Sequence, residues 1–128
     1  MKPKPVVKKI LIVEDERILA ISLKMDLEEA GYEEITMVTN CDDACHAVEE
    51  ESPELILMDI SIQGEKNGID TAERISSFSR VPVIYLTGET DPDTRTKAER
   101  TPNCKGYLNK PVNMQVLEPL IQQVLSEV

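Results

Sequence analysis

Short unbroken runs of apolar residues alternate with longer amphipathic segments along the chain. The clearest runs are Ile10–Val13 and Leu55–Met58, and each leads straight into acidic residues. An apolar run of this length fits a strand that is buried on both faces, as in the interior of a parallel sheet. The pattern as a whole predicts strands at 8–13, 35–38, 55–59, 81–86 and 105–108.

Between these strands, apolar residues recur at spacings of three and four, which is the spacing of one face of a helix. The first such segment ends at Gly31, a residue type that commonly terminates helices. The second begins at a capping residue, either Asn40 or Asp42. The predicted inner faces carry Ala20, Leu23, Leu27 and Ala30; Cys41, Ala44, Cys45 and Val48; Ile69, Ala72 and Ile75, with Phe78 beyond; and Met114, Leu117, Ile121, Val124 and Val128.

Prolines mark both ends of one helical segment and disturb another. A short and very polar helix is expected to start at Asp91-Pro92, a cap followed by a first-turn proline, and to stop before Pro102. Pro119 falls inside the last helical pattern, where a proline removes a backbone hydrogen bond and clashes with the preceding turn. Two interpretations stay open: the helix begins near Leu117, or it is kinked.

Strands and helices alternate five times, without an internal linker, repeat or low-complexity tract. Right-handed crossovers between parallel strands place helices on both faces of a sheet, so the alternation predicts an α/β fold. The 128 residues match one domain in size. We expect residues 1–7 to be a flexible lead-in and residues 8–128 to form the domain.

Composition argues against several classes of function. The formal net charge of −10 argues against nucleic acid as a direct partner, because phosphate binding depends on clusters of Lys and Arg. The apolar runs are too short to span a bilayer. The odd count of three cysteines, Cys41, Cys45 and Cys104, indicates free thiols and a cytoplasmic location. A metal site at Cys41, Cys45 and His46 is an alternative, but the cysteines share an apolar helix face and are interpreted as core thiols.

Chemistry-bearing residues collect where the predicted strands end. In a parallel sheet all carboxyl ends of the strands lie along one edge, where ligands bind. Glu14 and Asp15 follow the first strand and Asp59 ends the third. Thr87 follows the fourth strand and Lys110 comes after the fifth. Three carboxylates, one hydroxyl and one ammonium group are therefore expected to meet.

The three carboxylates need a cation. Two unit charges about 4 Å apart repel by roughly 4 kcal/mol at an effective dielectric constant near 20. A small, oxygen-seeking divalent ion relieves this, which favours Mg²⁺, with Mn²⁺ as a second possibility. Asp59 is then the candidate nucleophile toward phosphorus, giving an acyl phosphate. Thr87 and Lys110 are placed to stabilise the phosphoryl oxygens.

These motifs resemble those of a known family. The set Glu14-Asp15, Leu57-Met58-Asp59, Leu86-Thr87-Gly88 and Lys110-Pro111 is similar in order and spacing to the receiver (CheY-like) domain of two-component response regulators. The resemblance covers about Lys8 to Val128. It implies a flavodoxin-like (βα)5 three-layer sandwich, with a five-stranded parallel sheet in the order 2-1-3-4-5 and helices on both faces.

The resemblance also implies a metal set around the phosphoacceptor. Asp59 matches the phosphoacceptor, which also contacts the metal. Asp15 matches the direct metal ligand, and Glu14 matches the acid that binds the metal through water. Ser61 matches the position that gives a backbone carbonyl to Mg²⁺.

A second implied set forms a switch. Thr87 and Lys110 match the family's switch hydroxyl and its lysine. Tyr107, three residues before Lys110, matches the aromatic residue that changes rotamer when Thr87 is drawn to the phosphoryl group. The family also suggests that the Lys110–Pro111 peptide bond is cis.

The chain departs from the family pattern in a few places. The loop from Asp59 to Gly68 is one residue longer than usual and carries Gln63-Gly64 where Met-Pro is common. Glu14 replaces the commoner Asp. Ser61 and Glu89 occupy positions where the family tunes the rate of dephosphorylation.

The function that follows is a phosphorylation switch. A histidine kinase or phosphotransfer protein is expected to donate a phosphoryl group to Asp59, and the surface formed by the fourth helix, fifth strand and fifth helix is expected to shift toward an unidentified output partner. No membrane partner is expected, and the chain is expected to be a monomer or a weak homodimer. It is not expected to be an enzyme beyond Mg²⁺-dependent self-phosphorylation and autodephosphorylation.

Two other functions are weighed against the switch. An aspartyl-phosphate phosphatase normally needs a second acid two residues after the nucleophile, and this chain has Ser61 there. A phosphate-independent binding module would keep the fold alone, and the complete set of five polar groups argues against it.

Overall fold

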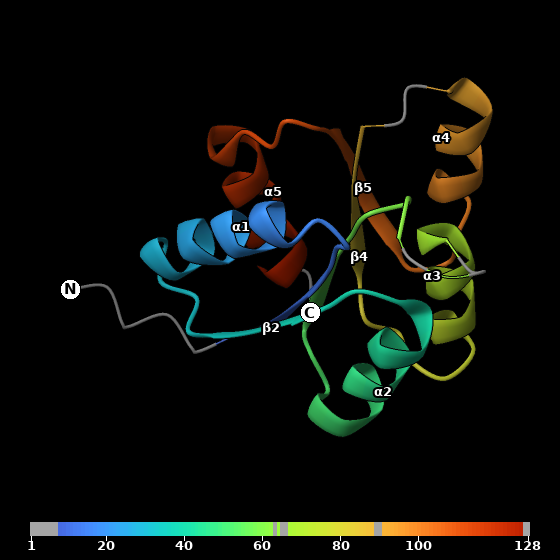
Figure 1. Ribbon diagram of the computed structural model, residues 1–128, viewed down its shortest axis with the longest axis horizontal. Helices are drawn as coiled ribbons and strands as arrows, with labels where there is room; N and C mark the ends of the chain where they lie inside the picture. The colour runs from blue at the N-terminus through green and yellow to red at the C-terminus, as the bar shows by residue number, and fades with distance from the viewer. Residues whose placement is uncertain (1–7, 63, 65–66, 89–90, 127–128) are drawn as a thin grey trace.

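The computed structural model describes residues 8–62, 64, 67–88 and 91–126. Five strands form one parallel sheet in the order β2-β1-β3-β4-β5, with helices on both faces (Figure 1). The strands are β1 (Lys9–Val13), β2 (Glu34–Val38), β3 (Leu55–Met58), β4 (Val83–Thr87) and β5 (Cys104–Asn109). The helices are α1 (Arg17–Glu29), α2 (Cys41–Glu51), α3 (Gly68–Ser76), α4 (Pro92–Glu99) and α5 (Met114–Ser126). The predicted flavodoxin-like α/β fold and strand order are confirmed.

Side chains alternate along each strand, so the sheet builds two separate cores. On one face, α1 and α5 cover a cluster that contains Ile10, Ile12, Leu55, Leu57, Ile84 and Leu86 from the strands. On the other face, α2, α3 and α4 cover a cluster that contains Leu11, Val13, Ile56, Met58, Val83 and Tyr85. Strands β3 and β4 therefore bury every residue, which explains why they appear as apolar runs in the sequence.

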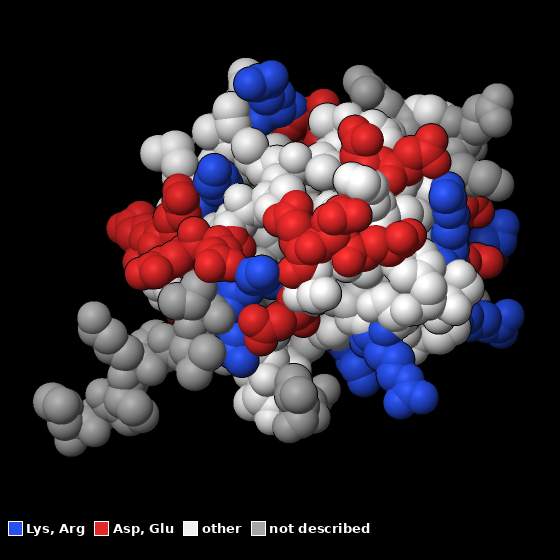
Figure 2. Space-filling model, turned by 90° about the horizontal axis from the view of Figure 1, so that it is seen from below, with Lys and Arg blue, Asp and Glu red and all other residues white. Residues whose placement is uncertain are grey.

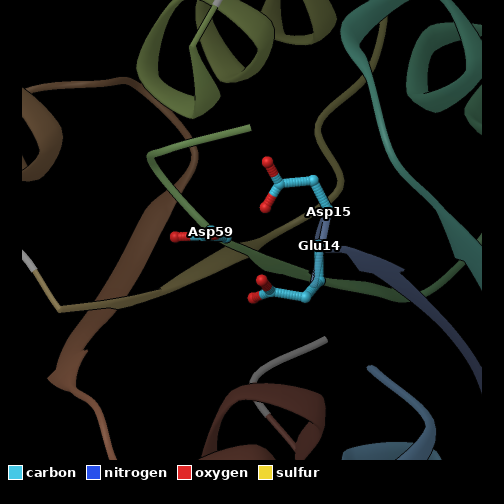
Figure 3. Close-up of side chains that lie close together, drawn as sticks. All are labelled: Glu14, Asp15 and Asp59. Carbon is cyan, nitrogen blue, oxygen red and sulfur yellow. The ribbon is translucent and has the colours of Figure 1, made fainter. Parts of the chain in front are cut away.

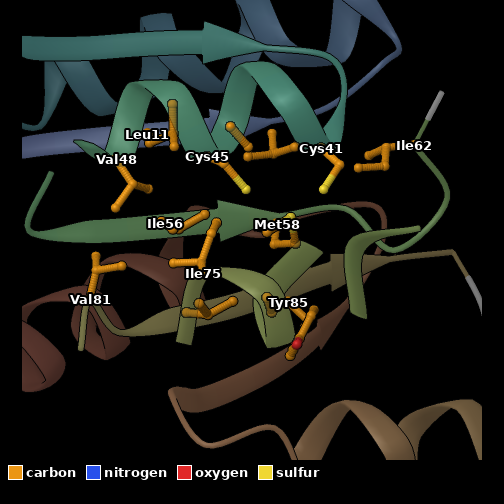
Figure 4. Packing of buried hydrophobic residues seen from close by; sticks show 14 of the residues in the cluster. Leu11, Cys41, Cys45, Val48, Ile56, Met58, Ile62, Ile75, Val81 and Tyr85 are labelled. Atoms are coloured by element: carbon orange, nitrogen blue, oxygen red, sulfur yellow. The ribbon is translucent and has the colours of Figure 1, made fainter. Parts of the chain in front are cut away.

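The thiols of α2 belong to the second core. Cys41 and Cys45 point from α2 toward β3 among apolar side chains (Figure 4). Burial, with Cys41 as a neighbour, raises the pKa of the Cys45 thiol to about 11. His46 is exposed, and among the described residues it joins no cluster of potential metal ligands. The interpretation of these cysteines as free core thiols is confirmed.

Most predicted helix ends agree with the structure, with differences at α3 and α5. Asn40 caps α2, and its side chain accepts a hydrogen bond from the Asp43 amide. The third helix is shorter than its apolar pattern suggested. Helix α3 stops at Ser76, and Phe78 is 44% exposed in the following turn.

The last helix, α5, begins earlier than Leu117, which was one of the two interpretations of the Pro119 pattern. The expectation that it starts near Leu117 is wrong, because α5 starts at Met114 and contains Pro119. The Asn113 side chain accepts a hydrogen bond from the Gln115 amide, which satisfies a donor of the first turn and allows the earlier start. A kink at Pro119 stays a prediction.

Acidic side chains dominate one face of the molecule. Seen from below the view of Figure 1, they form a band across the middle, while Lys and Arg lie mainly near the edges (Figure 2). This distribution agrees with the formal net charge of −10. Separately, none of the described helices combines the length and the apolar character needed to cross a bilayer.

The start of α3 packs directly against the end of β3. Asn67 caps this helix in a reciprocal pair with Asp70. The Gly68 amide donates to the Ile60 carbonyl at 2.7 Å. A Cβ atom on Gly68 would lie 2.9 Å from the Ile60 Cα and closer still to the Asp59 carbonyl oxygen. Only glycine lets the helix approach the Asp59 backbone this closely.

We expect Gly68→Ala to lower the free energy of unfolding by about 1–3 kcal/mol, because the added methyl group must push α3 away from the end of β3. Urea denaturation followed by circular dichroism measures this. Gly88→Ala is the matched control, since no described heavy atom lies within 4 Å of a Cβ there. Its effect should stay below about 1 kcal/mol. Equal effects of the two substitutions would contradict the proposed close packing.

Candidate functional site

The parallel pairing of β1 and β3 brings two acidic residues side by side. Val13 and Met58 are the last register partners of these strands, so Glu14 and Asp59 follow at the same level. The Asp59 amide donates to the Val13 carbonyl at 2.9 Å. The Glu14 amide donates to the Val38 carbonyl of β2 at 3.0 Å. Backbone hydrogen bonds therefore fix both acids at the carboxyl edge of the sheet.

Three carboxylates share the space above these strand ends. Oxygen atoms of Glu14, Asp15 and Asp59 all lie within 4.8 Å of one another. Figure 3 shows the three side chains pointing the same way from the ends of β1 and β3. Glu14 and Asp59 are buried, with 6% and 5% exposure, whereas Asp15 is partly exposed. A set of hard oxygen donors open on one side suits a small divalent cation that keeps some of its waters.

Lys110 reaches the same acids from the far end of the chain. Its Nζ lies 2.7 Å from Glu14 Oε2 and 3.3 Å from Asp59 Oδ2. Its backbone amide donates to the Thr87 carbonyl at 2.8 Å, which fixes the lysine at the end of β4. The predicted approach of Lys110 to Asp59 is confirmed. The closer contact with Glu14 was not foreseen, because nothing in the sequence pairs these two residues.

Burial and charge act in opposite directions on these groups. Burial raises the pKa of Glu14, and the Asp59 charge adds to this, while the hydrogen bond from Lys110 lowers it; the net shift is upward. Burial alone lowers the pKa of Lys110, but its contacts with Glu14 and Asp59 outweigh burial and raise it. The ammonium group therefore stays charged and offsets part of the repulsion between the two acids.

The other predicted site residues lie on neighbouring elements. Thr87 ends β4 and is 1% exposed. The Ser61 amide donates to Asp59 Oδ1 at 3.2 Å, which orients the carboxylate. Tyr107 lies on β5, where its ring is near the ring of Tyr85 and the guanidinium group of Arg95. The roles of Thr87, Ser61 and Tyr107 stay predictions.

Two further features complete the comparison with the sequence. The Lys110–Pro111 peptide bond is cis, as the resemblance implied. Gly64 has a φ of +97°, whereas Gln63 and Glu89 lie outside the described residues. The role of Gly68 was missed, because in the sequence it appears only as a loop glycine.

Comparison with known proteins gives one family match. The family model for the response regulator receiver domain matches residues 10–122. The transcriptional regulatory protein PdtaR of Mycobacterium tuberculosis is 31% identical over 119 residues, which cover 93% of this chain and 57% of that protein. The chain thus spans about half the length of the curated relatives it matches.

Solved structures of response regulator domains have the same fold as this chain. The signal receiver domain of a modulated diguanylate cyclase from Desulfovibrio desulfuricans G20 superimposes with a TM-score of 0.87 at 32% identity, covering 95% of this chain and 96% of that one. The N-terminal domain of a response regulator/sensory box/GGDEF protein from Carboxydothermus hydrogenoformans gives 0.84 at 33% identity, covering 94% and 95%.

We expect Lys110→Met to lower the free energy of unfolding by about 1–3 kcal/mol near pH 7 in a metal-free buffer, because Glu14 and Asp59 lose their cation. Removing the ammonium group also raises the pKa of Glu14 further. The loss is present while Glu14 is ionised and shrinks as the pH falls through its raised pKa, since a protonated carboxyl needs no cation.

Urea titrations at several pH values measure this difference. Lys8→Met is the matched control, because Lys8 Nζ pairs with Glu54 Oε2 at 3.0 Å in a more exposed position. A cost for Lys110→Met that equals the control, or that does not change with pH, would contradict the electrostatic account.

Proposed function

Because the chain belongs to the response regulator receiver domain family, we propose that it is a phosphorylation switch in which Asp59 accepts a phosphoryl group. The observation that carries the proposal is the convergence of Glu14, Asp15 and Asp59 with Lys110 at one edge of the sheet. A histidine kinase or phosphotransfer protein is the proposed donor. The output partner is a protein or an attached domain that binds one state of the switch.

The donor set fits a magnesium ion. Asp15 and Asp59 would bind the metal directly, Glu14 would hold one of its waters, and the Ser61 carbonyl would supply a further oxygen. All are hard oxygen donors, as Mg²⁺ requires, and Mn²⁺ is an acceptable substitute. A bound Mg²⁺ would neutralise the developing charge of the phosphoryl group.

The proposed reaction transfers phosphorus from nitrogen to oxygen. An Asp59 carboxylate oxygen attacks the phosphorus atom, the bond from phosphorus to the donor histidine nitrogen breaks, and an acyl phosphate forms. Lys110 would turn from its present acid partners toward a phosphoryl oxygen, and the Thr87 hydroxyl would donate to another. The Ser61 amide already holds Asp59 Oδ1 and leaves Oδ2 on the Lys110 side.

The phosphoryl group replaces one negative charge by about two. Thr87 and Tyr107 would transmit this change from the end of β4 to β5, and the surface of α4, β5 and α5 would shift its population toward the partner-binding form. The family is typically a non-enzymatic signalling module. We propose that this chain catalyses only its own phosphorylation and dephosphorylation.

The remaining parts of the proposal concern assembly and location. The chain would act as a monomer or a weak homodimer, without direct contact with nucleic acid. Its three free cysteines support a reducing compartment such as the cytoplasm.

Incubation with acetyl phosphate and Mg²⁺ should add one phosphoryl group to the chain, as measured by intact-protein mass spectrometry. Asp59→Asn should abolish the gain, because an amide is not a carboxylate nucleophile. Glu49→Gln, which removes an exposed acid from α2, should leave it unchanged. No gain in the wild-type chain, or an equal gain in Asp59→Asn, would refute the proposal.

Magnesium should stabilise the folded chain, because the ion binds the three carboxylates where the fold brings them together and not in the unfolded chain, where they are apart. At a concentration of about 100 times the dissociation constant, the expected increase in the free energy of unfolding is about 2.7 kcal/mol relative to EDTA. Asp15→Asn should remove this increase without lowering the stability in EDTA, since one like charge is lost. Glu49→Gln should retain it. An increase that survives Asp15→Asn would place the ion elsewhere.

A further inference from the structure

Helix α4 is attached to the sheet by few apolar contacts. Ala98 is the single buried residue of this eight-residue helix, whereas α2, for example, buries Cys41, Ala44, Cys45, Ala47 and Val48. One buried alanine removes little apolar surface from water. The position of α4 therefore depends on contacts made by particular side chains around it.

The carboxyl end of α4 is anchored by a buried hydrogen-bond chain. The Thr101 hydroxyl donates to the Ala98 carbonyl at 2.7 Å and lies 2.8 Å from the Tyr85 hydroxyl. Since the Thr101 proton is used at Ala98, Tyr85 is the donor to Thr101. Tyr85 is fully buried on β4, and burial raises the pKa of its hydroxyl, which keeps the donor protonated. This end of the helix is tied to β4.

The middle of α4 meets the sheet through a different contact. The Arg95 guanidinium carbon lies 5.0 Å from the ring centroid of Tyr107, which is a cation–π distance. Tyr107 is the register partner of Tyr85, and their ring centroids are 6.4 Å apart. Arg95 is exposed, so its contact can be broken without leaving a charge buried.

We propose that Arg95 is a latch that holds Tyr107 in its present position and so sets how readily phosphorylation at Asp59 is transmitted to α4. The inference rests on the proposed function and adds to it a positioning residue for the switch. A rotation of the Tyr107 ring away from α4 would break the Arg95 contact, while Tyr85 and Thr101 keep the carboxyl end of α4 in place. The amino-terminal part of the helix is thereby released about a fixed end.

The size of the effect follows from the type of contact. A cation–π contact at an exposed site changes the ratio of two arrangements by about two- to fivefold. Arg95 also pairs with Glu99 at 3.4 Å, one helical turn away, and this ion pair must be separated from the latch. Glu99→Gln removes the ion pair and keeps the cation over the ring.

The contact itself is tested without a phosphodonor, in the full chain. Amide hydrogen exchange in α4 is compared among wild type, Arg95→Met, Tyr107→Leu and the double variant. We expect Arg95→Met to reduce protection by about two- to fivefold, and to have no further effect once Tyr107 is leucine. Lys97→Met, an exposed charge on the same helix, and Glu99→Gln should leave most of the protection intact.

The switching role is tested with acetyl phosphate and Mg²⁺. The ring signals of Tyr107 in nuclear magnetic resonance spectra are assigned by their loss in Tyr107→Leu. In Arg95→Met without donor, they should move toward the positions seen in the phosphorylated wild type. Arg95→Lys, which retains a cation, should recover part of the wild-type spectrum. The extent of phosphorylation at saturating donor should be the same in the three proteins of this experiment that retain Tyr107, which are wild type, Arg95→Met and Arg95→Lys.

Several results would overturn the latch. These are additive effects of Arg95→Met and Tyr107→Leu, equal effects of Arg95→Met and Lys97→Met, or a full effect of Glu99→Gln. Tyr107 signals that stay at their wild-type positions in Arg95→Met would also overturn it. A wild-type chain that takes no phosphoryl group, with the Arg95–Tyr107 coupling intact, would instead contradict the proposed function, and the regulatory role would fall with it.

Discussion

Repulsion among three carboxylates is the constraint on which the site depends. The parallel register of β1 and β3 places Glu14 and Asp59 at the same level, and Asp15 follows Glu14 directly. Two of these acids are almost removed from water, so their charges are poorly screened. Lys110 offsets part of this charge and lies nearer to Glu14 than to Asp59. A divalent cation would balance the remaining negative charge, and the proposed phosphoryl group would add to the charge that this cation offsets.

The fold could be predicted because its pattern is local and repeated. Unbroken apolar runs identified β1, β3 and most of β4, because both faces of the sheet are covered there. The strand ends then identified Glu14, Asp15, Asp59 and Lys110 as neighbours, because parallel strands share one carboxyl edge. This inference did not depend on how far apart the residues are in the sequence. It required only that the strands be parallel.

The finer contacts of the site could not be predicted in the same way. The pairing of β4 with β5 shifts register between Val83 and Ile84, so that Ile84 faces Gly106 and Lys105 is passed over. The predicted strand pattern does not show this irregularity, although it places Lys110 after the end of the fifth strand. The approach of Gly68 to the Asp59 backbone likewise depends on how α3 packs on the sheet.

Helix α4 shows the same division between pattern and packing. Its cap at Asp91, its first-turn proline and its polar character follow from the sequence and are confirmed. Its attachment depends on Tyr85 of β4, Tyr107 of β5, Arg95 of α4 itself and Thr101 in the connection that follows, and it becomes visible only in three dimensions. A helix with little apolar burial suits a switch, since the free energy that holds it in place is small.

The central claim is that Glu14, Asp15 and Asp59 form a cation site at the group that takes the phosphoryl group. Anomalous diffraction from crystals grown with Mn²⁺ tests this most directly, because the ion reports its own position. The account predicts one strong peak within coordination distance of the Asp15 and Asp59 carboxylates. No peak there, or a peak only at other acidic residues, would contradict it.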